Sequence, residues 1–568
     1  MESFDSSASR PLVYIPSIPI FDPLEFDRSL PSSQYTLIKT HDLRIMYKEI
    51  GRVQAYLHNL IRHGDAAPSL VVDDSKQAKP AGAAVERIPP EIISMIFQQL
   101  VPPHTDDKHP DETHHLAEIL LPGQICKSWR EVAIATPTLW SSLCFNFNNP
   151  KNIVEKMVDI ATTCIARAKS RPLSIYLRMR GAELVRYRPI IAVLLAHSHH
   201  WENLFMIESS MGLRRIAHEE LQGAKGRLSM LRRLKVDYGN IEEWGSLDTF
   251  LTLPKLRIVD LRNSTVPGWH ETGQFPLLPW RQLQQIAFTG RVQDALELLR
   301  MSPSLQVFKA STWGRSEGPY HVHHAFLREL TLRIARFAGD FIEKVTLPAL
   351  VSLSYESRGD GFPARAISSF VERSGISQSL QTLSLELTHD EPGDISMDIS
   401  HIAGCFKSMP GLSQLFLHDE SKRRYTVDDS RYGHDLCTGD IGSICEAILG
   451  DSMLPKLKQL SIKGPSGMSY VHLALLVGSR WRHPLGDFVR IESVAVNYSG
   501  SCTHAKSSMT QIPAHTESRE SGWALALLRQ YRSEGLRVVG PPVDEDECIE
   551  CIEEHGHHTF QTRVFYRR

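Results

Sequence analysis

Short apolar triplets recur along most of the chain and constrain its fold more than any other sequence feature. Each has the form apolar-x-x-apolar-x-apolar, and eleven of them begin between Trp201 and Ile491, at intervals of 22 to 45 residues. Five follow a Pro-x-Leu lead, as in Leu347-Pro348-Ala349-Leu350. Because side chains two residues apart share one face of a strand, the last two residues of each triplet predict a short strand with one buried face. The triplets are Trp201/Leu204/Met206, Leu231/Leu234/Val236, Leu256/Val259/Leu261, Leu283/Ile286/Phe288, Leu305/Phe308/Ala310, Leu327/Leu330/Leu332, Leu350/Leu353/Tyr355, Leu380/Leu383/Leu385, Leu412/Leu415/Leu417, Leu457/Leu460/Ile462 and Ile491/Val494/Val496.

The stretches between triplets can be helical, for example 292–300 and 441–449. One strand and one helix per segment would stack into a solenoid with a parallel sheet, in which each segment covers its neighbour's apolar face. The pattern resembles leucine-rich repeats of the irregular sort found in F-box proteins. It covers residues 150–568, which include a C-terminal tail. Most segments lack the Asn that satisfies turn backbone groups in that family. An α/β domain with Leu-rich strands is the alternative.

Composition and charge narrow the function classes. Of 568 residues, 42% are apolar and 23% charged, which is typical of a globular protein with a sizeable core. The formal net charge of -2 provides no basic field for nucleic acid. The longest purely apolar run is Ile190–Ala196, far short of the ~20 residues of a membrane span. No secretory signal opens the sequence. We therefore expect an intracellular protein, cytoplasmic or nuclear, without membrane or nucleic-acid partners.

Three segments precede the central part of the chain. Residues 1–36 are rich in Ser, Pro and Asp, which predicts an extended or disordered arm. Residues 37–61 carry apolar residues at alternating spacings of three and four, which predicts a helix. That helix either lies on the next domain or forms a dimeric coiled coil. Residues 62–84 are small and polar, as in a linker.

A distinctive motif occupies residues 88–140. Ile88-Pro89-Pro90-Glu91 predicts a helix start, because Pro is tolerated in the first turn and Glu91 lies at the positive end of the helix dipole. An apolar stripe of Ile92, Ile93, Ile96, Phe97 and Leu100 follows, and Pro102 and Pro103 end the helix. A second helix is expected from about Gln124 to Ala135, stopped by Thr136-Pro137-Thr138-Leu139-Trp140.

This order of residues resembles an F-box, and more narrowly the F-box-like proteins that are numerous in mushroom-forming fungi. The loop between the two helices is longer than in the family pattern, and a middle helix would fall near Leu116–Leu121. The resemblance places an F-box-like domain at residues 85–147. The expected fold class is α/β: a short N-terminal helix and an all-α F-box, followed by an irregular leucine-rich-repeat solenoid with a parallel sheet.

The resemblance also implies a docking role. F-box domains bind the Skp-type adaptor of a cullin–RING ubiquitin ligase, and the chain would be its non-catalytic substrate-recognition subunit. The adaptor-binding positions carried over by motif are Ile88, Pro89, Glu91, Ile92, Ile96, Ile125 and Trp129. A box of about fifty residues buries too little surface to hide every apolar side chain, which suits an interface. Trp129 has an alternative role in the core of the box, and a ligase-independent scaffold is the alternative function. The protein substrate is not marked in the sequence.

Signatures of enzymes and cofactor sites are mostly missing, so we expect no enzyme and no cofactor. The sequence has no phosphate-binding loop, no His-Glu-x-x-His and no dinucleotide fingerprint. Gly314-Arg315-Ser316-Glu317-Gly318 is interpreted as a solvated turn, since Pro319 follows where a nucleophile elbow needs a helix. The nine cysteines are sparse and mostly lie in apolar runs, which predicts reduced thiols. Cys548 and Cys551, with His555, His557 and His558, have spacing that can bind zinc, but a polar tail with a final strand at 560–566 is the favoured interpretation.

Overall fold

The computed structural model describes the chain from Pro89 onward, with gaps. The described residues are 89–100, 119–147, 154–179, 184–208, 221–237, 248–262, 275, 277–316, 320–334, 338–358, 363–388, 399–419, 448, 453–464, 470–482, 488–502, 526–540 and 558–566. Those from Pro90 onward belong to one compact region. The predicted arm (1–36), heptad helix (37–61) and linker (62–84) lie outside the described residues, as does Ile88.

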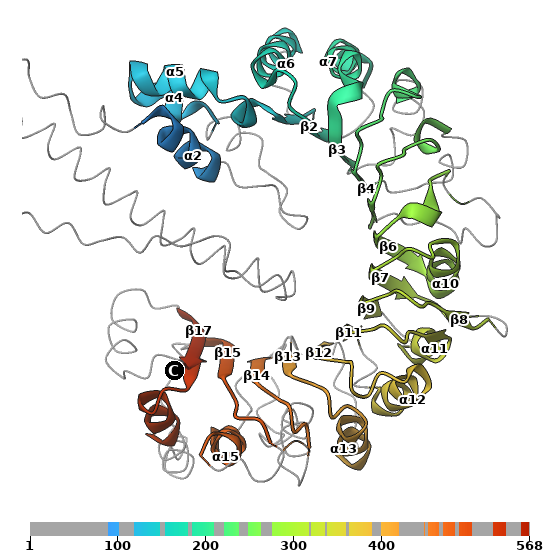
Figure 1. Cartoon of the computed structure of the whole chain (residues 1–568), viewed down its shortest axis with the longest axis vertical. Coiled ribbons are helices and arrows are strands. Elements are labelled where there is room, and N and C mark those ends of the chain that lie inside the picture. Colours follow the sequence, from blue (N-terminus) through green and yellow to red (C-terminus); the bar gives the residue numbers. More distant parts are fainter. Residues whose placement is uncertain are drawn as a thin grey trace, which may run out of the picture. The chain divides into compact units, whose positions relative to one another are not determined.

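One long sheet, mostly parallel, dominates the described part of the chain. Its strands follow each other in nearly sequential order, each beside its neighbour in Figure 1. The expected α/β class is therefore consistent with the structure. The strands are β1 (Ser142–Asn146), β2 (Leu173–Met179), β3 (Trp201–Glu208), β4 (Arg233–Asp237), β5 (Ile258–Leu261), β6 (Gln285–Arg291), β7 (Val307–Trp313), β9 (Glu329–Ile334), β11 (Ser352–Arg358), β12 (Thr382–Thr388), β13 (Gln414–Asp419), β14 (Gln459–Gly464), β15 (Ser493–Cys502), β16 (Arg537–Gly540) and β17 (His558–Tyr566). A separate pair, β8 (Val322–His323) and β10 (Val345–Thr346), forms a two-stranded sheet.

All eleven triplets lie where the sequence predicts strands. In ten of them the first residue precedes a strand of the sheet, whereas Trp201 is itself the first residue of β3. In all eleven the last two residues lie on the strand. Neighbouring triplets are in register, so Leu330, Leu353 and Leu383 pair in succession across β9, β11 and β12. Apart from Val496, whose side chain is not described, every triplet side chain is at most 2% exposed. The prediction that the triplets form one buried face of a parallel sheet is confirmed.

The helices lie along one side of this sheet (Figure 1), so the buried triplets face them and the other side of the sheet remains as its open face. On the open face lie the residues that alternate with the triplet positions, such as Lys235 and Asp260. The predicted helix at 292–300 is confirmed; of 441–449 only Ile448 is described, and it is helical. The helices beside the sheet are α6 (Val154–Ala168), α7 (Leu184–Ala196), α10 (Val292–Met301), α11 (Ala338–Glu343), α12 (Ala364–Ser374), α13 (Ile399–Lys407) and α15 (Tyr470–Trp481).

Side chains from the next triplet segment cap the turns that precede several strands. Gln282 Nε2 donates to the carbonyls of Leu253, at 2.5 Å, and Leu256, at 3.0 Å. A ring nitrogen of His324, Nε2, lies 2.9 Å from the carbonyl oxygen of Ser302. All three acceptor residues belong to the Pro-x-Leu leads 253–256 and 302–305. These long polar side chains satisfy turn backbone groups where the regular Asn is missing.

Two arginines cap turn carbonyls in the same way. Arg373 on α12 donates through Nη2 to the carbonyl of Ile342 at 2.6 Å and to that of Val345 at 3.0 Å. Arg480 on α15 donates through Nη1 to the carbonyl of Leu454 at 2.6 Å. Arg480 is only 3% exposed. The caps therefore link one triplet segment to the next through buried or half-buried hydrogen bonds.

The C-terminal end of the sheet departs from the parallel order. Strand β17 runs antiparallel to both β15 and β16. It begins at His558 and ends at Tyr566, so the predicted final strand at 560–566 is confirmed. It covers the C-terminal half of β15 while β16 pairs with the N-terminal half. Cys548 and Cys551 lie outside the described residues.

The described cysteines predict a sharp difference in thiol reactivity. Cys126, Cys144, Cys164 and Cys405 are free thiols, and Cys126 is exposed. Burial raises the pKa of Cys164 to about 11 and that of Cys405 to about 12. Because the thiolate is the reactive form, iodoacetamide near pH 7 should label Cys126 in the native protein and leave Cys164 and Cys405 unlabelled. Peptide mass spectrometry before and after unfolding in guanidinium checks this; native labelling of Cys405 would contradict the packing of α13.

Candidate functional site

The helical segment before the sheet is built around a small aromatic core. Helix α2 (Pro90–Leu100) begins at a proline and carries Glu91 in its first turn, as the sequence predicts. Its residues Ile93 and Phe97, four apart, are 2% and 0% exposed. The Phe97 ring meets the Trp129 ring edge to face, with centroids 5.2 Å apart. The core therefore uses one side of α2 and leaves its other side to solvent.

The predicted second helix from Gln124 to Ala135 is in fact two helices. Helix α4 (Pro122–Ile125) ends at Cys126, whose backbone is extended, and α5 (Lys127–Ala135) starts after it. The Cys126 sulfur accepts a hydrogen bond from the Trp129 backbone N–H at 3.4 Å and so caps α5. Of the predicted middle helix at 116–121, the structure describes Ile119 and Leu120, which are helical, and Leu121, which is in a turn.

Large apolar side chains gather on the surface of this segment. Seven of the twelve exposed large apolar side chains in the described part of the chain belong to residues 90–135. We call this set the apolar surface of the box; its members, with exposed fractions, are Ile92 (46%), Met95 (61%), Ile96 (39%), Leu120 (46%), Leu121 (46%), Ile125 (55%) and Ile134 (42%). Ile92, Met95 and Ile96 share one face of α2 by their helical spacing.

The residues named from the motif divide between this surface and the core. Pro89 and Glu91 are exposed, and Ile92, Ile96 and Ile125 belong to the apolar surface. Trp129 is partly buried and packs on Phe97, which favours its alternative role in the core. The motif missed Met95, Leu120, Leu121 and Ile134, although the spacing of Met95 from Ile92 could have identified it. Adaptor binding by these positions stays a prediction.

Comparison with known families decides what this segment is. Residues 85–146 match the family model described as F-box-like. The chain therefore carries an F-box-like domain, and the exposed apolar side chains above all lie within it. A search of curated proteins finds no match to the chain.

The F-box-like domain is joined to the sheet through a packed turn. A 3-10 turn (Pro137–Trp140) follows α5, and its Trp140 is 4% exposed. The Trp140 indole Nε1 donates to the carbonyl of Ala133 at 2.8 Å, and the Arg167 guanidinium of α6 lies 4.3 Å from the centre of its ring. Strand β1, the last part of the F-box-like domain, pairs directly with β2. Backbone hydrogen bonds thus attach the domain to the sheet.

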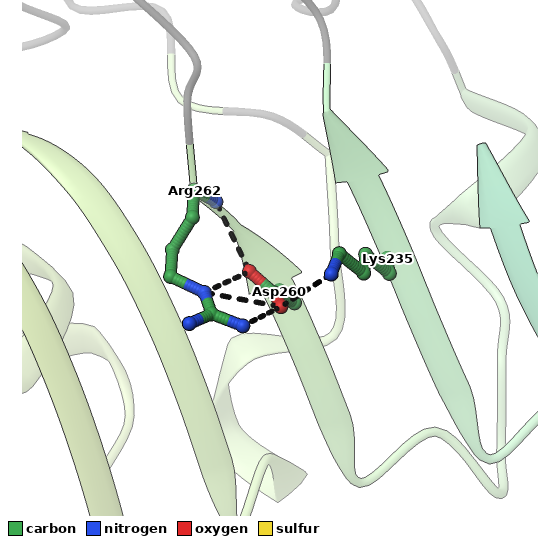
Figure 2. A network of polar contacts seen from close by, with 3 residues as sticks. All are labelled: Lys235, Asp260 and Arg262. Carbon is green, nitrogen blue, oxygen red and sulfur yellow. Dashed lines mark hydrogen bonds and ion pairs between the residues drawn. The ribbon is translucent and has the colours of Figure 1, made fainter. Parts of the chain in front are cut away.

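A second candidate site is a charged network on the open face of the sheet. Figure 2 shows Lys235 on β4, Asp260 on β5 and Arg262 just after β5. Arg262 donates to Asp260 through Nη2 at 2.8 Å and through Nε at 3.0 Å, and Lys235 Nζ lies 3.7 Å from Oδ2. The Lys235 and Asp260 side chains are 8% and 9% exposed. Two cations thus share one buried carboxylate.

The pKa of Asp260 reflects this competition. Burial alone would raise the pKa, but the hydrogen bonds and charge of Arg262, with the charge of Lys235, lower it below its usual 3.8. A lowered carboxyl pKa stabilises the fold above the unfolded-state pKa, and this contribution is lost as the pH falls through the folded-state value.

We expect the Asp260→Asn variant to lose about 2 kcal/mol of stability at pH 7, because the buried Lys235 and the half-buried Arg262 lose the carboxylate that they share. The difference from the wild type should shrink as the pH falls below the unfolded-state pKa of about 3.8. Urea unfolding at several pH values measures it. Asp248→Asn removes an exposed ion pair with Lys225 and should change stability far less. A loss at Asp260 that stays constant down to pH 2.5 would contradict this account.

The described residues contain no group of three or more His, Cys, Asp and Glu side chains that could hold a metal ion. Among them, none of the helices is both long and apolar enough to cross a membrane. Ser316 lies in an irregular segment after β7, where Oγ donates to Gln293 Oε1 at 3.2 Å. The candidate sites are therefore the apolar surface of the box and the charged network of Lys235, Asp260 and Arg262.

Proposed function

We propose that the chain is the substrate-recognition subunit of a Skp–cullin–F-box type ubiquitin ligase. In this proposal the F-box-like domain docks the Skp-type adaptor, and through it the cullin–RING ligase. The sheet and its helices form an irregular leucine-rich-repeat solenoid that presents a protein substrate. The protein would be of the type numerous in mushroom-forming fungi, and it would work inside the cell, in the cytoplasm or nucleus.

The observation that carries the proposal is an apolar surface in the part of the chain that matches the F-box-like family model. F-box-like domains are protein-interaction modules of such ligases, and F-box domains generally bind Skp1-type adaptors. Exposed apolar side chains gathered in one segment are typical of an interface. On α2, the exposed positions Ile92, Met95 and Ile96 have the spacing of a helix that lies in an apolar groove.

The role proposed for the chain requires no catalytic group of its own. A substrate bound to the solenoid is held near the ligase at a high effective concentration, so positioning alone accelerates transfer. The strand pairing between β1 and β2 supports this role, because it attaches the docking domain to the presenting sheet by backbone hydrogen bonds.

Co-purification tests the proposal. The full chain, tagged and co-expressed with a Skp-type adaptor, should retain the adaptor through affinity and size-exclusion steps. Capture from cells should add the cullin and RING subunits, identified by mass spectrometry. A full chain that elutes without the adaptor at micromolar concentrations of both would reject the ligase role and leave the ligase-independent scaffold.

A further inference from the structure

The turns that lead into five neighbouring strands form a basic rim. We define it as the four residues that directly precede each of β5, β6, β7, β9 and β11 (Figure 1), namely 254–257, 281–284, 303–306, 325–328 and 348–351. These stretches contain neither Asp nor Glu, and their basic residues are Lys255, Arg257, Arg281 and Arg328. The basic rim therefore has a formal charge of +4, whereas the whole chain has a net charge of -2. Adding the residue that begins each strand includes Glu329 and lowers the local charge to +3.

Backbone hydrogen bonds hold these stretches side by side. The N–H of Gln284 donates to the carbonyl of Arg257 at 2.8 Å. The N–H of Gln306 donates to Gln284, and that of Arg328 to Gln306, at the same distance of 2.8 Å. Arg257 and Arg328 are therefore three strand spacings apart, about 14 Å. An extended polypeptide covers the same distance in about four residues.

The cations of the basic rim are not neutralised by carboxylates. Lys255, Arg281 and Arg328 are exposed, and their side chains form no hydrogen bond or ion pair with any described residue. Arg257 is half-buried, and its Nη1 donates to two backbone carbonyls of its own turn, at 2.8 and 3.2 Å. Because these carbonyl groups have no net charge, Arg257 keeps its positive charge as well.

Cations at the same position outside the basic rim have acidic partners. Arg232 directly precedes β4, and its Nη1 lies 3.5 Å from Glu202 Oε1. Lys458 directly precedes β14, and its Nζ lies 3.0 Å from Glu492 Oε1. In both cases the neighbouring segment supplies the carboxylate. The uncompensated charge is thus a feature of the basic rim and not of this position in every segment.

An apolar patch accompanies the charge. Phe326 is 64% exposed, the largest fraction among the exposed large apolar side chains of the described residues. Pro303 and Pro348, both exposed, lie in the stretches on either side of it. Aromatic and arginine side chains are enriched where proteins bind each other. The basic rim therefore presents both positive charge and apolar area to a partner.

We propose that the basic rim binds an extended segment of a partner polypeptide that carries acidic and large apolar side chains. In an extended segment, carboxylates four residues apart match the distance between Arg257 and Arg328, and an apolar side chain midway between them lies on the same face. The inference rests on the proposed function only in taking that partner to be the ligase substrate; the binding itself does not require the adaptor.

A polypeptide fits the basic rim better than a nucleic acid. The middle stretch, 303–306, has no cation, so a continuous phosphate backbone would leave charge there without a partner. The exposed amides of Gln284 and Gln306 lie between the two arginines. An amide both donates and accepts hydrogen bonds, which suits the backbone of a peptide that passes between the charges.

The partner segment is proposed to come from another protein, because the proposed role of the solenoid is to hold a substrate. The chain has a stretch of similar chemistry in its own sequence, residues 20–27 (Ile-Phe-Asp-Pro-Leu-Glu-Phe-Asp). Binding of this stretch to the basic rim is therefore made an outcome of the test.

Fluorescence anisotropy with the purified full chain tests the proposal. The probe is a fluorescein-labelled peptide of three Glu-Ser-Leu-Ser repeats, which places Glu and Leu on one face when it is extended. It should bind, more weakly as salt rises, and a comparison peptide with Lys in place of Glu should not bind. Arg281→Glu and Arg328→Glu should each weaken binding of the probe about tenfold, because an exposed attraction becomes a repulsion.

Phe326→Ser tests the apolar part of the proposal. It should weaken binding of the probe about fivefold, because the Leu side chains lose apolar contact. A second comparison peptide, with Ser in place of Leu, should bind the wild type and Phe326→Ser equally. Equal binding of the probe itself by these two proteins would mean recognition by charge alone and would overturn the proposal.

Arg532→Glu is the matched control for Arg328→Glu. Arg532 is also exposed and also forms no side-chain hydrogen bond or ion pair with a described residue, but it belongs to the helix at 526–533, outside the basic rim. Its substitution should leave binding of the probe within about twofold of the wild type. An equal loss in Arg532→Glu and Arg328→Glu would mean general charge attraction and would contradict a site at the basic rim.

Two further outcomes would also overturn the proposal. One is tighter binding of single-stranded DNA of matched length, with the same sensitivity to Arg328→Glu. The other is at least tenfold tighter binding of the probe after Asp22, Glu25 and Asp27 are replaced by Ser, which would make the chain's own stretch the occupant. Adaptor binding by Arg328→Glu should equal that of the wild type, so failure of this inference and failure of the proposed function are separate results.

Discussion

An Ile92→Asp substitution should weaken binding of a Skp-type adaptor about a thousandfold. The side chain lies on the apolar surface of the box and is 46% exposed, so the free protein tolerates a charge there. In an apolar interface the carboxylate would lose its water without gaining a partner, at a cost of about 4 kcal/mol. Isothermal titration of purified adaptor into wild type and variant measures the change.

Leu475→Asp is the matched control for Ile92→Asp. Leu475 on α15 has the same exposed fraction, 46%, but lies far along the chain from the F-box-like domain. Its substitution should leave adaptor affinity unchanged, and circular dichroism melts of both variants should follow the wild type. Equal adaptor affinity in wild type and Ile92→Asp would reject the docking surface. If Ile92→Asp unfolds, Met95→Asp, at a position 61% exposed, replaces it.

An Arg480→Ala substitution should strongly destabilise the C-terminal part of the sheet. The guanidinium donates to the carbonyls of Leu454 and Met453, with a longer contact of 3.4 Å to that of Ile448. Burial lowers the pKa of Arg480 to about 10, so the side chain remains charged near pH 7. Its removal leaves buried carbonyls without donors, at a cost of about 3 kcal/mol in local stability.

Hydrogen exchange measured by mass spectrometry detects this loss. Amides of β14 and β15 should exchange about a hundredfold faster in Arg480→Ala, whereas those of β6 and β7 should keep their rates, because they lie far from the lost cap. Arg482→Ala, two residues away, removes an exposed pair with Glu534 and should change exchange little. Unchanged exchange in β14 would show that the cap adds nothing to stability.

The sequence predicted the sheet well because each triplet is a local pattern with one structural outcome. Apolar residues two apart, repeated eleven times, have to share a buried face, and the structure places all of these triplets in register. The triplet pattern did not predict strand β2, because the spacing of its apolar residues differs. Its apolar residues Leu173, Ile175 and Leu177 are evenly spaced, because the strand lacks one residue of the pattern and its register with β3 shifts at Leu173. Strand β16 is also short of the full pattern.

The candidate sites were predicted only in part. The apolar stripe of α2 identifies its apolar residues but not which of them are buried. In the structure Ile93 and Phe97 are buried, with Phe97 packed on Trp129, whereas Ile92 and Ile96 are exposed. The break at Cys126 depends on a sulfur cap that has no sequence signature. The Lys235–Asp260–Arg262 network joins residues that are 25 positions apart, so the sequence could not reveal it before the register of β4 and β5 was known.

We expect the turn caps to delay folding during synthesis. The side chains that satisfy the carbonyls of Leu253, Ser302, Val345 and Leu454 come 29, 22, 28 and 26 residues later in the chain. While the ribosome is still adding those residues, each newly emerged turn has polar groups that only water can satisfy, and it cannot be sealed from solvent. The nascent protein should therefore complete its structure one segment behind the point of translation, and a truncation is best tolerated just after a capping residue.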